Sequence, residues 1–209
     1  MLSLKPAFPQ WLIARAFMGV MLAIVLIACA ASSDPNQPTG VNQHIRQLAT
    51  VTLDPTKVTV GQTLYVPVYS YIYHHNRPDQ IINLATTLSI RNTDLEHPIT
   101  LTSVRYYDTN GVFIRQYTEA PVELPPLAST EVFIQTDDLT GGTGANFIVE
   151  WVATTPVYAP VVEAVIISTA SSQGISLITS GRVLRQFGQL KPLEQPAANK
   201  PAAQQPVAN

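Results

Sequence analysis

The stretch NFIVEWVA, residues 146–153, decides the fold because its side chains alternate in character along the chain. One set of alternate residues is apolar and includes two large aromatic side chains: Phe147, Val149, Trp151 and Ala153. Glu150 lies in the other set, so the stretch has the two-residue period of a β-strand with one buried and one outer face. We therefore expect a strand here, with Phe147 on the face that enters the core.

Shorter runs of β-branched and aromatic residues follow the same rule elsewhere, and Pro, Gly, Asn or Asp separates them about every ten residues. In residues 84–91 the expected core face consists of Leu84, Thr86, Leu88 and Ile90. The pair Asn110-Gly111 indicates a tight hairpin, because both residues tolerate positive φ. The runs predict strands near residues 49–53, 63–73, 82–92, 99–108, 112–118, 130–136, 146–153, 161–169 and 176–185.

About nine strands in about 140 residues predict an all-β fold. We expect a single two-layer antiparallel sandwich of immunoglobulin-like size. The sandwich is expected at residues 48–188, after a flexible tether at 29–47 and before a disordered tail rich in Pro, Ala and Gln at 189–209. The formal net charge of −2 gives no electrostatic basis for binding nucleic acid.

The beginning of the chain resembles a bacterial lipoprotein signal peptide, which we place at residues 1–28. Lys5 and Arg15 supply its positive charge, and the uncharged apolar run after Arg15 is shorter than a bilayer span. The tetrapeptide LIAC at residues 26–29 resembles a lipobox, in which the cysteine becomes the lipid-bearing first residue of the mature protein. The alternative is a permanent transmembrane helix with an ordinary buried thiol, but Arg15 interrupts such a helix.

Cys29 is the only cysteine among the 209 residues and is the expected lipidation site. Several acyl chains attached there would tie the mature protein durably to a bilayer. The lipoprotein resemblance implies export, and Ala30 after the cysteine implies transfer to an outer membrane where the host has one. We expect a protein that is anchored to a bacterial membrane and faces the periplasm or cell envelope.

The run LYVPVYSYIY, residues 64–73, places several aromatic residues on one face of the expected strand. The first candidate binding surface consists of Tyr65, Tyr69, Tyr71 and Tyr73. A row of exposed tyrosines could contact a protein partner or stack on sugar rings, because each ring is flat and apolar with a polar tip. Alternatively, the strand is central and its rings fill gaps beneath loops.

His74 and His75 follow the tyrosines directly. Adjacent side chains of an extended chain point to opposite sides, so this pair is poorly placed to bind one ion. The other two histidines, His44 and His97, are far away in sequence. We expect no metal and no cofactor.

The loop DDLTGGTGAN, residues 137–146, is the second candidate site. Its carboxylate, amide and carbonyl oxygens are of the kind that bind calcium, although their spacing does not match an EF-hand. The alternative is a structural loop in which glycines take positive φ and aspartates cap backbone donors. The residues considered for ligand contact are Asp137, Asp138, Gly142, Gly144 and Asn146.

The sequence contains no pattern that is typical of an enzyme. It has no Gly-x-Ser-x-Gly elbow, and lipidation would use its only thiol. The spacing of the glutamates selects no acid–base pair. Three arginines are instead expected to pair with carboxylates across strands: Arg91, Arg105 and Arg182. We therefore expect a protein that is not an enzyme, and a hydrolase of unknown class is the alternative.

Several sequence blocks occur in a characteristic order. They are YVPVYS (65–70), ATTLSIRNT (85–93), YYDTNG (106–111), GGTGANFIVEW (141–151), and GIS (174–176) with SGR (180–182). This order resembles an uncharacterised bacterial lipoprotein family that carries a domain of unknown function, over roughly residues 60–185. The resemblance implies a β-sandwich and assigns no activity, so it transfers no functional residue.

These observations lead to one functional hypothesis and one alternative. The hypothesis is a lipid-anchored, non-catalytic β-sandwich protein of the cell envelope that presents a binding or assembly surface to a protein or glycan partner. The alternative is a glycan-binding or carbohydrate-active envelope module, which requires the tyrosines to lie exposed and coplanar beside a groove with a carboxylate. Full burial of Tyr65, Tyr69 and Tyr71 would exclude this alternative.

Overall fold

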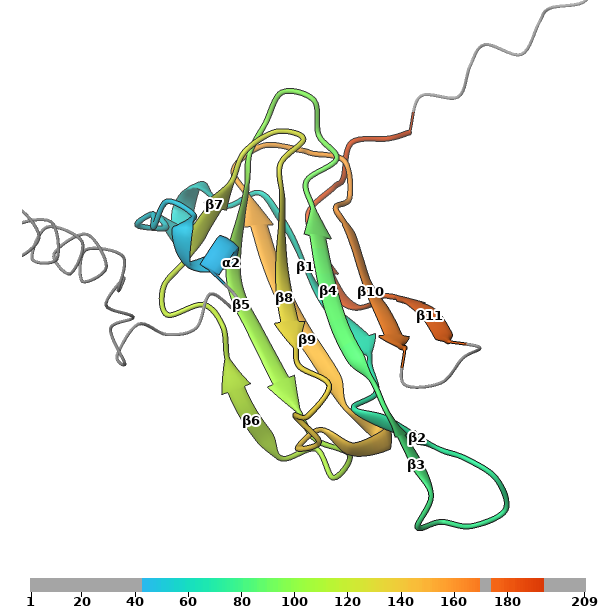
Figure 1. The fold of residues 1–209 in the computed structure, drawn as a ribbon. Helices are drawn as coiled ribbons and strands as arrows, with labels where there is room; N and C mark the ends of the chain where they lie inside the picture. The colour runs from blue at the N-terminus through green and yellow to red at the C-terminus, as the bar shows by residue number, and fades with distance from the viewer. Residues whose placement is uncertain (1–42, 170–173, 194–209) are drawn as a thin grey trace, which may run out of the picture. The chain divides into compact units, whose positions relative to one another are not determined.

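The chain forms two facing antiparallel sheets and a separate small hairpin, as Figure 1 shows. This computed structural model describes residues 43–169 and 174–193. Strands predominate in these residues, and the single α-helix among them is the short α2 (Gln43–Gln47). The prediction of an all-β, two-layer antiparallel sandwich is confirmed.

The larger sheet has six strands in the order β12-β1-β9-β5-β6, and β7 also pairs with β5. Its strands are β1 (Val60–Pro67), β5 (Ile99–Tyr107), β6 (Phe113–Gln116), β7 (Val122–Leu124), β9 (Asn146–Ala153) and β12 (Arg182–Phe187). The stretch NFIVEWVA is β9, which lies between β1 and β5. A central position explains why its inward side chains are so large and apolar.

The smaller sheet has four strands in the order β11-β10-β4-β8. They are β4 (Ala85–Arg91), β8 (Ser129–Ile134), β10 (Val161–Ser168) and β11 (Ile175–Ser180). A two-stranded hairpin joins β1 to β4 and consists of β2 (Tyr71–Tyr73) and β3 (Ile81–Asn83). Two 3₁₀ turns complete the described elements: η1 (Pro55–Lys57) and η2 (Gly142–Gly144).

The core lies between the two large sheets, where their inward faces meet. The predicted inner face of β9 is confirmed, because Phe147, Val149 and Trp151 have no exposed surface. The predicted inner face of β4 is confirmed as well, since Leu88 and Ile90 are equally buried. Each side chain of this size contributes about 1.5–3 kcal/mol when it leaves water.

The expected strand at residues 63–73 is interrupted, and the reason lies in Pro67. Pro67 has no N–H to donate, and the backbone then leaves the sheet. The N–H groups of Val68 and Ser70 donate to the carbonyls of Ala145 and Gly142, each at 2.9 Å. A loop therefore takes the place of a neighbouring strand at Val68 and Ser70, and the chain then forms the separate strand β2.

The expected strand at residues 176–185 is also two strands, which lie in different sheets. Gly181 alone joins β11 of the smaller sheet to β12 of the larger one. A Cβ at Gly181 would lie 3.1 Å from the Val162 carbonyl oxygen and 3.2 Å from Leu64 Cδ2. Glycine thus permits the close approach that lets the chain change sheets.

The expected strand at residues 49–53 forms only an isolated bridge, Thr50 to Val122, and β7 was not expected. Packing contacts also extend past the expected sandwich boundaries. Ile45 of α2 is 1% exposed and belongs to the core. At the other end, Lys191 N–H donates to the Val157 carbonyl at 2.8 Å.

Candidate functional site

The lipidation site predicted at Cys29 lies outside the described residues, as does the rest of the predicted signal peptide. Within residues 43–169 and 174–193, no helix has both the length and the apolar character that crossing a bilayer requires. The remaining predicted site residues all lie in the described part of the chain.

The four tyrosines do not form the single row that the sequence predicted. Tyr65 is on the outer face of β1, opposite Ile148 and Arg182 on its two neighbouring strands. Tyr69 is partly buried and packs against the core. Because the chain breaks after Pro67, only the other two tyrosines remain neighbours.

Tyr71 and Tyr73 lie on one face of the β2–β3 hairpin, with ring centroids 6.0 Å apart and ring planes at 75°. Asn83 is paired with Tyr71, and Ile81 with Tyr73, so these four side chains share that face. We call Tyr71, Tyr73, Ile81 and Asn83 the hairpin face. Tyr73 is 58% exposed and Ile81 38%. On the opposite face Ile72 and Ile82 pack against the core, which fixes the hairpin to the sandwich.

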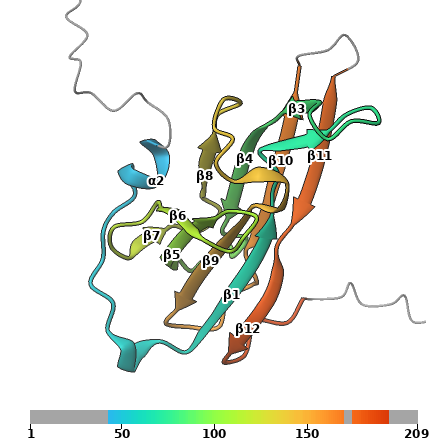
Figure 2. The same cartoon turned by 90° about the horizontal axis from the view of Figure 1, so that it is seen from below.

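The hairpin stands out at one end of the sandwich (Figures 1 and 2). Its connecting loop carries both predicted histidines, His74 and His75. The expectation that their side chains diverge is wrong, because the ring centroids of His74 and His75 are 3.5 Å apart. His75 has a φ of 58°, so the chain turns there instead of continuing as a strand. In the part of the chain that the structure describes, no group of three or more His, Cys, Asp or Glu residues is arranged for a metal.

The glycine loop lies directly against the start of this hairpin. Its Gly142 carbonyl accepts the Ser70 N–H, as described above, and Gly142 has a φ of 73°. The Gly141 carbonyl accepts from the backbone N–H and hydroxyl of Thr109, both at 3.0 Å. Since these carbonyls already bind backbone and side-chain donors, they are not directed toward a bound ion.

The two aspartates of the loop have different roles. Asp138 Oδ1 accepts from the Thr140 N–H at 3.2 Å and from its hydroxyl, and Oδ2 lies 3.8 Å from an Arg115 nitrogen. This capping role agrees with the structural interpretation of the loop. Asp137 is exposed instead, and it lines a shallow cavity of about 400 Å³ together with Asn83, Phe133, Gln135 and Thr136.

Two sites predicted separately in sequence are thus brought together at the hairpin end. Asn83 belongs both to the hairpin face and to the wall of the Asp137 cavity. Of the other predicted loop residues, Gly144 donates its N–H to the Thr109 hydroxyl at 2.9 Å, and Asn146 is the first residue of β9. Neither lines this cavity.

A buried hydrogen bond ties the hairpin end to the core. The hydroxyls of Ser70 and Tyr106 lie 3.1 Å apart, and both residues are 1% exposed. Burial raises the pKa of Tyr106, and the hydrogen bond with Ser70 opposes this rise only in part. The Tyr106 hydroxyl therefore stays protonated, and it holds the segment between β1 and β2 in one position.

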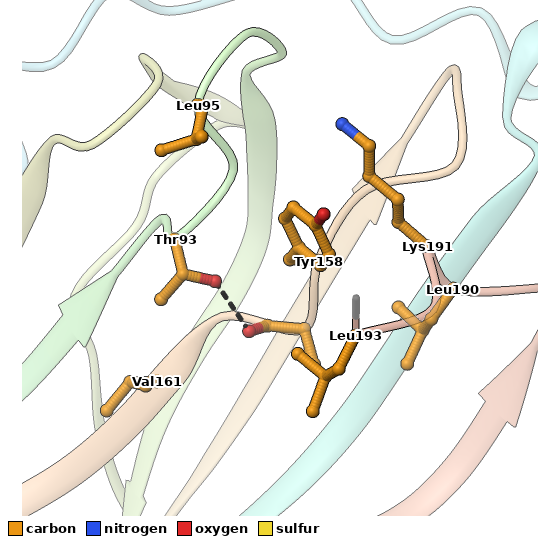
Figure 3. A pocket seen from close by; sticks show the side chains of 8 residues that line it. Thr93, Leu95, Tyr158, Val161, Leu190, Lys191 and Leu193 are labelled. Carbon is orange, nitrogen blue, oxygen red and sulfur yellow. Dashed lines mark hydrogen bonds between the residues drawn. The ribbon is translucent and has the colours of Figure 1, made fainter. Parts of the chain in front are cut away.

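A larger, apolar cavity of about 680 Å³ lies at the opposite end, where β4 ends (Figure 3). It is lined by Thr93, Leu95, Tyr158, Ala159, Val161, Leu190, Lys191 and Leu193. Figure 3 shows the Thr93 hydroxyl donating to the Ala159 carbonyl, at 2.9 Å. The ammonium of Lys191 lies 4.9 Å from the centre of the Tyr158 ring.

Asp94 stands between Thr93 and Leu95, which line this cavity; it connects three segments of the chain, and its side chain has no exposed surface. Its carboxylate accepts N–H bonds from Glu96, His97 and Tyr158 at 3.0, 2.9 and 3.1 Å. Lys191 Nζ lies 3.6 Å from Oδ2. Burial alone raises the pKa of Asp94, but the three N–H donors and the Lys191 charge outweigh burial and hold this pKa below its ordinary value.

Asn92 completes the same cluster and was missed as a structural residue. Its side-chain amide donates to the carbonyls of His97, Leu124 and Pro125 at 2.9, 3.1 and 3.0 Å. The pattern Asn92-Thr93-Asp94 after a strand signals a turn. It does not reveal the donors from residues 158 and 191, which are distant in sequence.

Two of the expected cross-strand ion pairs are present. Arg105 lies 2.9 Å from Glu150, and Arg91 lies 3.4 Å from Glu163. Both pairs are on outer faces of the sheets, so each contributes about 0–1 kcal/mol. Arg182 forms no ion pair with any residue that the structure describes.

Two antiparallel sheets around one core, with a projecting hairpin at one end and an apolar cavity at the other, define an all-β sandwich protein. The family model described as "Protein of unknown function (DUF3124)" matches residues 61–184, and the chain belongs to this family. The match runs from β1 into β12, so it spans the sandwich and confirms the resemblance to an uncharacterised domain family. No match was found among the curated proteins or among the solved structures.

Proposed function

We propose that the protein is a non-catalytic binding module of the cell envelope, which lipid on Cys29 holds at a membrane. The hairpin face is its binding surface, and a protein is the partner that best fits it. The observation that carries this proposal is the projecting hairpin itself. Tyr73 and Ile81 are exposed on one face of the hairpin, although its opposite face packs against the core.

The physical argument rests on rigidity and apolar area. Tyrosine offers a large contact area with few rotatable bonds, so little side-chain entropy is lost on binding. The Ser70–Tyr106 hydrogen bond and the packing of Ile72 and Ile82 hold the hairpin in place before binding. A preformed surface of this kind binds a partner without the cost of ordering a loop.

The absence of catalysis is part of the proposal, and the distribution of carboxylates supports it. Four cavities lined by described residues each contain at most one carboxylate, which is too few for an acid–base pair. The carboxyl whose pKa is most clearly lowered, that of Asp94, is enclosed by N–H donors. Its lone pairs are therefore not available to a substrate.

A glycan partner is the second candidate, and the cavity beside the hairpin supports it. Amide and carboxylate groups of Asn83, Gln135 and Asp137 surround this cavity, and such groups hydrogen-bond to sugar hydroxyls. The 75° angle between the Tyr71 and Tyr73 planes argues against it, because two coplanar rings would be needed for a flat stacking platform. The partly buried tyrosines do not exclude a glycan.

The two partners predict different sensitive residues, so one experiment separates them. Full-length protein purified from membranes is immobilised and exposed to the protein fraction and the glycan fraction of an envelope extract. Tyr73→Ser should reduce retention of a protein partner about tenfold, because an exposed aromatic anchor is lost. Asp137→Asn should reduce only glycan retention.

Phe113→Ser is the matched control, because Phe113 on β6 is 51% exposed and lies outside the hairpin face. It should leave both kinds of retention unchanged. Equal retention by the wild type, Tyr73→Ser and Asp137→Asn would show that the hairpin end is not the binding surface.

A further inference from the structure

Strand β11 leaves one side of its backbone without a partner among the described residues. It pairs only with β10, at the end of the smaller sheet. Gly181 N–H donates to the Val162 carbonyl at 2.8 Å, in register with the β10–β11 ladder. Alternation along an antiparallel ladder then directs the N–H and C=O groups of Ser176, Ile178 and Ser180 away from β10.

The other edge strands of the two large sheets carry features that discourage pairing with another chain. Each of them contains a charged residue: Arg115 in β6, Glu123 in β7, Glu131 in β8, and Arg182 with Arg185 in β12. In β12 the register with β1 also shifts, which leaves Leu184 as an extra residue in a bulge. Charges and bulges are common protections of a sheet edge.

Strand β11 has none of these protections. Its sequence ISLITS contains no charge and no proline, and its register with β10 is continuous over all six residues. Ile178 is 68% exposed and Leu177 37%. A regular, uncharged and apolar edge of this kind is suited to accept a further strand.

The edge is also complementary to itself. If two copies meet antiparallel about a two-fold axis through Ile178, each Ile178 lies opposite the other copy's Ile178. The same register sets Ser176 opposite Ser180 and Leu177 opposite Thr179, so each side chain stays on its own face of the sheet.

Electrostatics also permits this contact between identical strands. No charged side chain of β11 meets its own copy, and Glu163, which lies opposite Ser180 on β10, is already paired with Arg91 at 3.4 Å. The same arrangement at β12 would bring together arginines that form no ion pair with described residues. Like charges that face each other across strands are destabilising.

We propose that a second copy of this chain docks on β11, so that the two four-stranded sheets join into one continuous sheet across a symmetric dimer. The contact supplies partners for the outward backbone groups of Ser176, Ile178 and Ser180. It also covers part of the exposed surface of Ile178. This inference concerns the sandwich alone and does not depend on the lipid anchor or on the hairpin face.

Thiol cross-linking of full-length protein in membranes tests the proposed register. With Ile178→Cys, two thiols lie opposite each other at a Cα separation of about 5.5 Å, which a disulfide can span. A covalent homodimer is expected after mild oxidation. Leu184→Cys, at a 58% exposed position of β12, is the matched control and should remain monomeric.

The unchanged chain is the second control and separates this proposal from the lipid anchor. Its single thiol is Cys29, so a dimer of the unchanged chain on oxidation would contradict lipidation. The β11 proposal would then be tested by whether Ile178→Cys forms more cross-linked dimer than Leu184→Cys. Lack of a dimer with Ile178→Cys would overturn the β11 proposal. A cross-linked product with the mass of a different protein would overturn it as well, because β11 would then bind a foreign strand.

A charge substitution gives an independent measurement. Ile178→Lys places two ammonium groups opposite each other and should weaken dimerisation of the detergent-solubilised chain about tenfold or more, as measured by light scattering. Leu184→Lys should leave the dimer unchanged. A monomeric mass for the unsubstituted protein at every concentration would contradict the proposal, and circular dichroism confirms that each variant is folded.

Discussion

At the scale of single residues, Asp94 shows how one buried charge organises a whole end of the sandwich. Its carboxylate binds backbone N–H groups from two loops, and Lys191 supplies the opposite charge from a third segment. Removing water from a carboxylate is costly unless such donors replace it. Here the donors are numerous enough that the charged form is the favoured one.

Asp94→Asn should therefore destabilise the protein by about 2–3 kcal/mol, because an amide supplies one acceptor oxygen where two are used and brings an N–H toward the donor of Tyr158. The pKa of Asp94 is lower in the folded than in the unfolded chain, where it is about 3.9. Its stabilising contribution is thus complete above about pH 4 and is lost as the pH falls toward the folded value.

Urea denaturation of both proteins at several pH values checks this prediction. The difference in free energy of unfolding should be largest near neutral pH and should shrink in acid. Asp79→Asn, at an exposed carboxylate paired with Arg77, is the control and should change stability little. A difference that stays constant down to pH 2 would contradict the assigned role of the Asp94 charge.

At the scale of elements, the strands could be predicted wherever one face is apolar and the other is not. β4 and β9 are of this kind, and their inner faces are found where the alternation placed them. Pro67 can end a strand, but the partner that the chain takes after β1 could not be predicted, because a loop about 75 residues later supplies the carbonyls that bind Val68 and Ser70. The tyrosine pattern of residues 64–73 continues through this break, so it does not show that the backbone changes its hydrogen-bond partner there.

The candidate site was predictable only in its parts. The tyrosines and the 137–146 loop were found from their composition. Asn83 and Asp137 line one cavity only because the fold brings them together, and the sequence does not show this. The apolar cavity was missed for a related reason. Its walls come from three separate segments, and the residues among 190–193 lie in a stretch whose composition resembles a disordered tail.

The segment after β12 gives a prediction at this scale. A chain that ends at Gly188 loses the Lys191 contacts with Val157, Asp94 and Tyr158, and should be about 1–3 kcal/mol less stable. A chain that ends at Leu193 keeps them and should match the full-length protein. Thermal unfolding followed by circular dichroism compares the three, and equal melting temperatures would contradict a stabilising role for residues 189–193.

At the scale of the whole molecule, the two ends of the sandwich are chemically different. The hairpin end carries exposed aromatic and amide groups beside a carboxylate, whereas the other end carries an apolar cavity beside a buried, fully bonded charge. The edge strand β11 adds a lateral surface by which two such molecules can assemble.

The proposed attachment of the protein to a membrane depends on Cys29, so a substitution of Cys29 is the control for a direct test. Cys29→Ser should remove lipid labelling and leave a longer, unprocessed chain, because the serine hydroxyl cannot form the thioether. The folded sandwich should be unaffected, since the residue precedes every described element.

Intact-mass spectrometry of the full-length product, recovered from the membranes of a bacterium that processes lipoproteins, shows directly whether Cys29 carries lipid. We expect a polypeptide that begins at Cys29 and carries the added mass of a diacylglyceryl group and its acyl chains. A chain that still begins at Met1 and carries a free thiol at Cys29 would contradict this expectation.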